Sequence, residues 1–205
     1  GSEMCIRDSL MNYASGVTVN ATNTAQFGNN SVAMNLSLPS SITDNGTLVF
    51  GLGSGNSYTL SSLVSGSGAL TDASGTLTIT AANSYTGLTS VSSGANLSLI
   101  PSSAVQTTMA GGISNSGYVL FDGSNIASVS ATGIFYPSAS GNGTWTITSS
   151  VAPYNQWSAR LLFYGATSST CTFSGLMTVT SYGNLWLQSG VSATSPIYLN
   201  GSNTT

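Results

Sequence analysis

A fifteen-residue segment occurs twice in this chain, and this repetition limits the fold more than any other feature of the sequence. Residues 85–99 (YTGLTSVSSGANLSL) align without gaps to residues 173–187 (FSGLMTVTSYGNLWL). Residues 42–50 (ITDNGTLVF) likewise resemble residues 113–121 (ISNSGYVLF), and the elements follow in the same order in both halves. A repeat that cannot bury its apolar face alone buries it against the next copy, so the sequence predicts a stacked architecture.

The segments within each copy alternate bulky apolar residues with Thr, Ser or Asn. Residues 75–80 (GTLTIT) and 143–148 (GTWTIT) are clear examples. A period of two is typical of a β-strand with one face turned inward. Gly, Asn and Asp, which favour turns, separate the segments at 44–46, 72–75, 93–94 and 122–123. No long window shows helical periodicity, so we expect an all-β protein.

Charged side chains are scarce, and this decides between two all-β architectures. They make up 3% of the 205 residues, with no His and no Lys, against roughly 25% in a typical soluble protein. In a β-solenoid, equivalent residues of successive turns stack about 4.8 Å apart, where like charges repel by roughly 1 kcal/mol even in water. Ser, Thr and Asn can instead hydrogen-bond along the column. We therefore favour a β-solenoid over the alternative, a β-sandwich, whose solvent-facing side usually carries more charge.

The repeats suggest how the chain is divided. We expect strands or a cap at 10–41, a first solenoid repeat at 42–112, a second at 113–190 with an insertion at 151–171, and the truncated start of a further repeat at 191–205. Residues 1–9 hold Glu3, Arg7 and Asp8 and match nothing downstream, so we expect an artefact of cloning or sequencing. Without Cys5, Cys171 is a lone thiol, which gives neither an intramolecular disulfide nor a metal cluster.

Residues 75–99 resemble the autotransporter-associated β-strand repeat. In that repeat an aliphatic strand is followed by Ala-Asn-x-Tyr-Thr-Gly, a Thr-rich strand, a Gly turn and a closing aliphatic strand; Ala82–Gly87 (ANSYTG) carries the central motif here. In the second copy, Phe173–Gly175 (FSG) replaces Tyr-Thr-Gly. The resemblance implies a right-handed parallel β-helix in a secreted bacterial passenger or giant surface protein, and it implies no activity, because such repeats usually form a stalk.

The composition argues against several functions. Arg7 and Arg160 are the only cations and the net charge is -3, whereas nucleic-acid binding needs clustered Lys and Arg. No run of 18 apolar residues is present, so we expect no membrane span in this segment. The many serines lack a His or Lys that could act as a base. We therefore expect no enzyme activity, no cofactor and no metal site.

Asp44, Asp72 and Asp122 are the aspartates beyond residue 9, and each falls in a predicted turn. A polysaccharide-cleaving site would need such carboxylates close together. A calcium site would need Asp44 and Asp122 on adjacent turns of the coil, and even this would be weak. The Thr-x-Thr pairs 78/80, 146/148 and 178/180 look too scattered for the long flat array that an ice-binding surface requires.

The insertion is the most unusual segment, because it concentrates aromatic residues and an arginine. Its candidate ligand-binding residues are Tyr154, Asn155, Gln156, Trp157 and Arg160. Aromatic rings flanked by amides and a guanidinium can stack on sugar rings or on a protein partner. The alternative is a loop that covers the core, followed by one further strand at residues 161–164.

We therefore expect a non-enzymatic stalk or fibre-forming segment of a secreted, extracellular microbial cell-surface protein. The open ends of a solenoid are unpaired edges, so copies of the chain could associate end to end. The alternative is an adhesin module that binds a glycan or protein partner through residues 151–164. A weaker alternative is a polysaccharide-active β-helix or a phage tailspike fragment.

Overall fold

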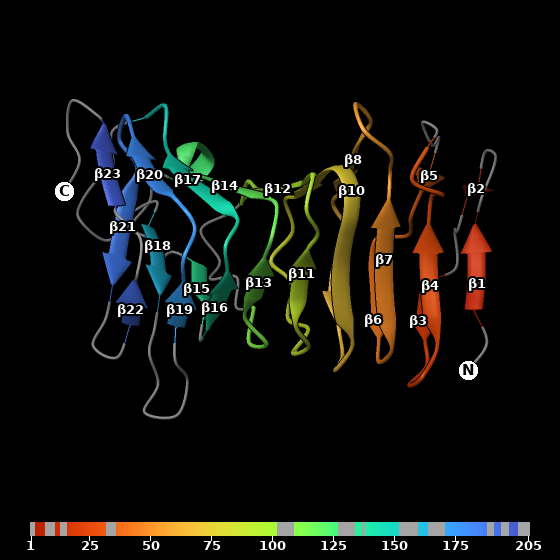
Figure 1. Cartoon of the computed structure of the whole chain (residues 1–205). Helices are drawn as coiled ribbons and strands as arrows, with labels where there is room; N and C mark the ends of the chain where they lie inside the picture. Colours follow the sequence, from red (N-terminus) through yellow and green to blue (C-terminus); the bar gives the residue numbers. More distant parts are fainter. Residues whose placement is uncertain are drawn as a thin grey trace.

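The chain winds into a β-solenoid, as the computed structural model shows, and its two termini lie at opposite ends of the coil (Figure 1). The structure describes residues 3–6, 11–12, 16–31, 36–101, 109–126, 134–136, 138–151, 160–163, 171–187, 191–193 and 197–200. Every strand pairing in these ranges is parallel, because each strand pairs with those one turn earlier and one turn later. The predicted β-solenoid is confirmed, and the β-sandwich alternative, which would require antiparallel sheets, is wrong.

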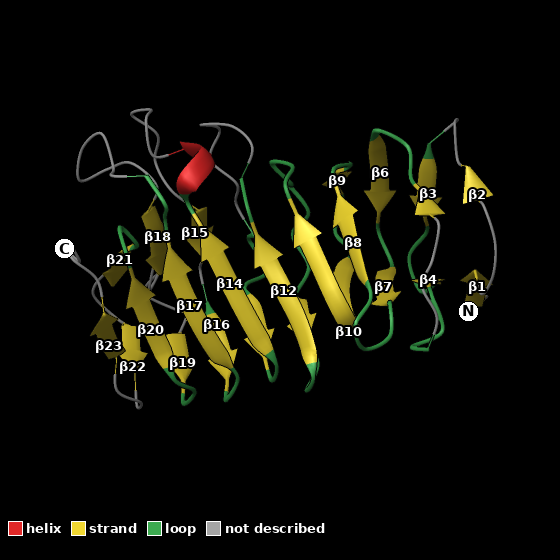
Figure 2. Cartoon of the chain, turned by 90° about the horizontal axis from the view of Figure 1, so that it is seen from above, coloured by secondary structure: helices red, strands yellow, loops and turns green. Residues whose placement is uncertain are grey.

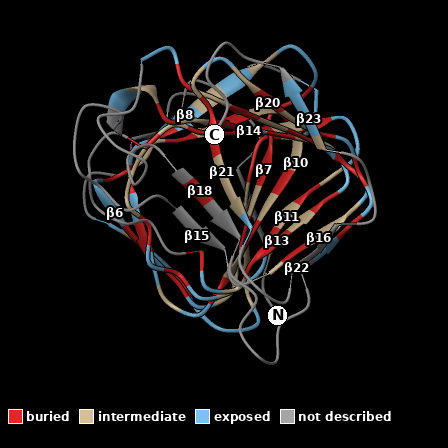
Figure 3. Ribbon diagram, turned by 90° about the vertical axis from the view of Figure 1, so that its left-hand side faces the viewer, coloured by how far each residue is buried: buried red, intermediate tan, exposed pale blue. Residues whose placement is uncertain are grey.

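Seen along its axis, the coil has three sides, and buried residues line its interior (Figure 3). The strands of the first side, in chain order, are β1 (Glu3–Ile6), β4 (Thr24–Phe27), β7 (Thr47–Gly51), β10 (Ala69–Ile79), β11 (Thr89–Val91), β13 (Ile113–Asn115), β16 (Ala139–Gly141), β19 (Cys171–Phe173) and β22 (Val191–Ala193). Residues Glu3–Ile6 thus form a strand that pairs with β4. That residues 1–9 are an artefact stays a prediction.

The strands of the second side lie next to one another in one sheet (Figure 2). Its strands are β8 (Ser57–Leu60), the C-terminal part of β10, β12 (Ala95–Leu99), β14 (Tyr118–Asp122), β17 (Thr144–Thr148), β20 (Met177–Thr180) and β23 (Ile197–Asn200). The third side comprises β3 (Val17–Val19), β6 (Ser41–Asp44) and β9 (Leu63–Ser65), and then β15 (Ile134–Tyr136), β18 (Arg160–Phe163) and β21 (Asn184–Leu187). The short strands β2 (Met11–Asn12) and β5 (Leu36–Ser37) pair with each other, and η1 (Ser124–Ile126) is the only helix in the described ranges, a single 3-10 turn.

Strand β10 belongs to two sides at once and so joins their strands into one 15-stranded sheet. It crosses the corner between them at a register shift between Asp72 and Ser74, next to Gly75 with a φ of +84°. The turn predicted at residues 72–75 is therefore wrong. The chain bends there without leaving the strand, because a bulge and a left-handed glycine turn a strand without ending its pairing.

The length of one turn varies along the coil. Paired residues of the second side are 20 apart from Thr76 to Asn96 and 32 apart from Trp145 to Met177. The longest turn is the one that contains residues 151–171. Variable turn lengths are tolerated because additional residues enter the loops between strands, where they leave the pairing unchanged.

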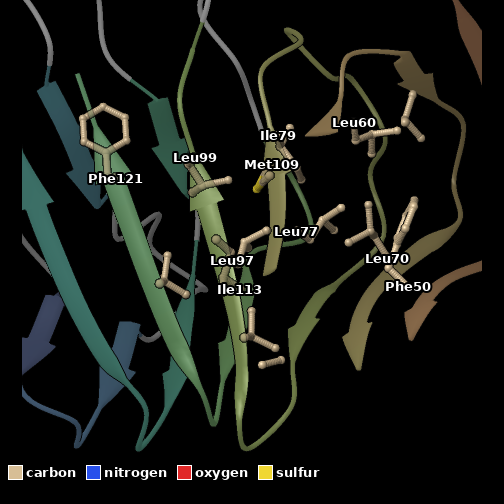
Figure 4. Packing of buried hydrophobic residues seen from close by; sticks show 14 of the residues in the cluster. Phe50, Leu60, Leu70, Leu77, Ile79, Leu97, Leu99, Met109, Ile113 and Phe121 are labelled. Carbon is tan, nitrogen blue, oxygen red and sulfur yellow. The ribbon is translucent and has the colours of Figure 1, made fainter. Parts of the chain in front are cut away.

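Apolar residues stack in columns that form the core. One column of the second side consists of Leu60, Ile79, Leu99, Phe121, Ile147 and Val179, each at most 3% exposed. Figure 4 shows Ile79, Leu99 and Phe121 of this column among the buried side chains that line the coil. Burying one side chain of this size contributes about 1.5–3 kcal/mol before chain entropy is counted.

The two sequence repeats share a local structure but occupy different corners of the coil. Corner 1 joins the third side to the first and comprises residues 44–47, 66–69 and 86–89. Corner 2 joins the first side to the second and comprises residues 115–118, 141–144 and 174–177. The sequence alignment is therefore right about local geometry, while the second copy lies one side further around the coil.

Backbone hydrogen bonds establish this equivalence of the two corners. At corner 1 the Gly68 N–H donates to the Asp44 carbonyl oxygen at 2.7 Å, and at corner 2 the Gly143 N–H donates to that of Asn115 at 2.9 Å. The Thr86 N–H donates to the Gly66 carbonyl at 2.9 Å, and the Ser174 N–H to the Gly141 carbonyl at 2.9 Å. Each side chain at corner 1 therefore has a matched position at corner 2 with which it can be compared.

The described part of the chain contains no helix that could span a membrane.

Candidate functional site

The predicted ligand-binding residues fall almost entirely outside the described part of the chain. Tyr154, Asn155, Gln156 and Trp157 lie in residues 152–159, which the structure does not describe. Arg160 is the first residue of β18, where its backbone pairs with Asn184. Binding by these residues therefore stays a prediction.

Asp122 has the role that was expected of a turn aspartate. Its Oδ1 accepts hydrogen bonds from the backbone N–H of Ser124, at 2.9 Å, and from the Ser124 hydroxyl. It lies in β14 on the second side, whereas Asp44 lies in β6 on the third side. The column of Asp44 and Asp122 that a calcium site would need does not form, and the described residues contain no cluster of three or more possible metal ligands.

Asp44 also closes a turn, but its carboxylate points into the coil. Its Oδ1 accepts the Gly46 N–H at 3.0 Å, and a Cβ added to Gly68 would lie 2.2 Å from its carboxyl carbon. The side chain is completely buried, and its Oδ2 has no hydrogen-bond partner. Burial raises the pKa of Asp44 from 3.8 to about 6, although the Gly46 N–H acts in the opposite direction.

Corner 2 has an amide where corner 1 has this carboxyl group. Asn115 Oδ1 accepts the Gly117 N–H at 2.9 Å, as Asp44 Oδ1 accepts that of Gly46. The Asn115 Nδ2 then donates to the Thr144 carbonyl oxygen at 3.0 Å. An ionised aspartate has no proton for such a bond. The Oδ2 of Asp44 occupies the place of an amide donor, so the corner geometry favours a neutral, protonated side chain.

Asp72 departs further from the turn role predicted for it. It lies within β10, paired between Phe50 of β7 and Val91 of β11. It is completely buried, and neither carboxyl oxygen has a hydrogen-bond partner. Burial raises the pKa of Asp72 from 3.8 to about 7. In the second copy the matched residue is Ile147 of β17, paired between Phe121 and Val179, so a carboxyl group replaces an aliphatic side chain in the core.

A third polar difference between the two copies is a pair of hydroxyl groups at corner 1. The Tyr85 and Thr89 hydroxyl oxygens are 2.7 Å apart and share a hydrogen bond, and both residues are completely buried. Burial raises the pKa of Tyr85 well above its usual value; the Thr89 hydrogen bond opposes this shift, and the Asp44 carboxylate adds to it. The matched residues at corner 2, Phe173 and Met177, are apolar and buried.

A hollow of about 180 Å³ and a larger one of about 320 Å³ lie at the surface of the described part. The larger is lined by Gly141, Asn142, Thr172, Phe173 and Ser174, and the smaller by Val17, Thr18, Val19, Asn20, Asn23, Thr24 and Ala25. Among the described residues, these linings offer hydroxyl, amide and backbone groups. Such groups are suited to hydrogen bonding with a neutral ligand.

The structure revises the expectation for the threonine pairs. Thr146 pairs directly with Thr178, which brings the pairs 146/148 and 178/180 into adjacent turns. Thr78 belongs to the same column but is separated from them by Ser98 and Leu120. The hydroxyl groups therefore form a patch two turns wide and not the long array that ice binding requires.

The inward aspartates could have been recognised from the sequence. Asp72 is two residues beyond Leu70, so the alternation of β10 places both on the same face. Asp44 aligns with Asn115 in the segments ITDNG and ISNSG, which identifies the amide as its counterpart. The prediction that these aspartates lie in turns gave more weight to the preference of Asp for turns than to these two signals.

No protein-family model matches the chain, and no curated protein or solved structure matches it at a significant level.

Proposed function

We propose that the chain is a non-enzymatic structural body: a stalk or fibre-forming segment of a secreted microbial cell-surface protein. The observation that carries the proposal is the 15-stranded parallel sheet with its continuous apolar columns. Backbone groups within such a sheet are paired, and each turn contacts only its neighbours, which suits a spacer whose length can vary. The resemblance of residues 75–99 to a stalk repeat supports the secreted location.

A display experiment tests the spacer role. The chain is placed between a membrane anchor and a domain of known ligand, and a Gly/Ser linker of equal length serves as control. We expect ligand capture to survive protease treatment with the solenoid and to be lost with the linker, because paired backbone resists cleavage. Equal loss with both spacers would refute the proposal.

An adhesin is the second candidate, and one observation favours it. The longest turn of the coil, 32 residues from Trp145 to Met177, carries Tyr154 and Trp157. Alanine at both positions should reduce binding to a glycan array or to cells at least tenfold. Alanine at Tyr198, which is 55% exposed at β23, is the matched control. Unchanged binding in the double variant would leave the spacer as the better proposal.

A polysaccharide-cleaving site has little support among the described residues. Asp44 and Asp72 are buried, and Asp122 lies on a different side of the coil from Asp44. End-to-end association stays a prediction. Leu199, which continues the column of Val179, is 65% exposed, so its apolar surface can be covered by a further turn or by a second copy.

A further inference from the structure

We propose that corner 1 and the first part of β10, which follows it, form a pH-sensitive section of the coil, which is tight while Asp44 and Asp72 are protonated and loosens when they ionise. Corner 2 and β17, where Asn115 and Ile147 occupy the matched positions, do not respond. This inference rests on the fold and is independent of the proposed function.

The geometry at Asp44 favours a protonated carboxyl group. Its Oδ1 is held by the Gly46 N–H, while its Oδ2 has no partner and takes the place of the Asn115 amide that donates to the Thr144 carbonyl. A protonated carboxyl group can act as a donor in the same way, whereas an ionised one presents negative charge where a donor belongs. The carboxyl group cannot move toward Gly68, because it already contacts the backbone of that residue.

Asp72 contributes through its position in the core. It stands in an apolar column between Phe50 and Val91, and both its oxygens are without partners. A neutral carboxyl group is tolerated there at moderate cost, but an ionised one requires either water or a rearranged strand. Loosening of β10 therefore follows ionisation.

No neighbouring group in the described residues compensates these charges. Strands β3 and β9, which flank β6, carry no ionisable side chain. The Asp44 carboxylate raises the pKa of the nearby Tyr85 phenol, which is neutral and so supplies no positive charge. Among the strands paired with β10, only β8 contributes a titratable residue, Tyr58, whose pKa is raised by burial. The backbone of Arg160 belongs to β18, in a sheet that includes neither β6 nor β10.

The direction of the effect follows from proton binding. The pKa of both groups rises from 3.8 in the unfolded chain, to about 6 for Asp44 and about 7 for Asp72. The folded state therefore binds more protons, so its stability is complete at acidic pH and falls as pH rises through these values.

The two copies within one molecule provide the test. Hydrogen–deuterium exchange of the whole chain is measured from about pH 5 to pH 8 and corrected for chemical exchange rates. We expect protection of residues 42–50 and 64–72 to fall at least tenfold relative to residues 113–121 and 139–147, because only the first two segments contain the titrating carboxyl groups of Asp44 and Asp72. A parallel change in both copies would overturn the proposal.

Variants identify the groups responsible. The double substitution Asp44→Asn and Asp72→Asn retains shape while removing both titrations, so the difference between the copies should disappear. Asn115→Asp should make residues 113–121 pH-sensitive in the wild-type background. If the double variant does not fold, the comparison of the two copies in the wild type and the Asn115→Asp variant still test the proposal. A corner 2 that stays insensitive to pH in the Asn115→Asp variant would count against it.

Discussion

Removing the Tyr85 hydroxyl should destabilise corner 1, and removing its partner as well should restore most of the loss. The two hydroxyl oxygens are 2.7 Å apart and both side chains are completely buried. Tyr85→Phe leaves the Thr89 hydroxyl with one weak contact, to the Met109 sulfur at 3.8 Å, and should cost about 1–2 kcal/mol. Thr89→Val leaves the phenol group buried without this partner and should cost about 1–3 kcal/mol.

The double variant should be close to wild type, because removing both members of a buried hydrogen bond leaves no unsatisfied group. Corner 2 already has this arrangement in Phe173 and Met177. The coupling energy, which is the difference between the double variant and the sum of the two single losses, should therefore be about 2 kcal/mol or more in magnitude, well above the 0.3–0.5 kcal/mol typical of independent sites.

Thermal unfolding followed by circular dichroism measures the effect. For a chain of this length, 1 kcal/mol corresponds to about 2–4 °C in Tm, so Tyr85→Phe should lower Tm by roughly 2–8 °C. Turns of a solenoid can unfold separately, so exchange of the β11 amides should be measured alongside. Phe173→Tyr, which places an unpartnered hydroxyl at corner 2, is the matched control and should also destabilise. If the single-variant losses simply add in the double variant, the reasoning is refuted.

Two further predictions concern the stacking of turns. Gly87→Ala should lower the free energy of unfolding by about 3 kcal/mol or more, because its Cβ would lie 2.1 Å from the Gly68 carbonyl oxygen and force two turns apart. Gly94→Ala is the control: its Cβ meets no atom within 4 Å, but the residue has a φ of +80°, so it should cost only about 1–2 kcal/mol. Urea unfolding measures both losses. Replacing both Thr146 and Thr178, which pair in adjacent turns, with lysine should lower the free energy of unfolding by about 1 kcal/mol more than the sum of the single variants. Salt at 1 M should remove this difference by screening the charges. Additive losses at low salt would contradict our explanation of why charge is so scarce.

The buried aspartates show how local preference and tertiary position can disagree. Asp favours turns, and Asp44 and Asp122 both accept backbone N–H groups there. Asp72 instead lies within β10, on the face that Leu70 turns toward the core. Its environment is fixed by strands one turn before and after it, and no local pattern of the sequence describes those neighbours.

The sequence by itself determined the architecture. Alternating apolar residues, repeated segments and the near-absence of charged side chains are each what a stacked parallel sheet requires or tolerates at every turn. It also located several strands, including residues 143–148 at β17 and residues 184–187 at β21. Only the tertiary structure decided which residues stack on one another. That depends on the number of residues in each turn, which varies from 19 between Ser57 and Thr76 to 32 between Trp145 and Met177. This variation displaced the second copy of the repeat to another corner of the coil, brought Thr146 beside Thr178, and placed Asp72 between Phe50 and Val91. Periodicity is a property of neighbours along the chain, whereas register between turns is set by loop lengths and core packing over the whole coil.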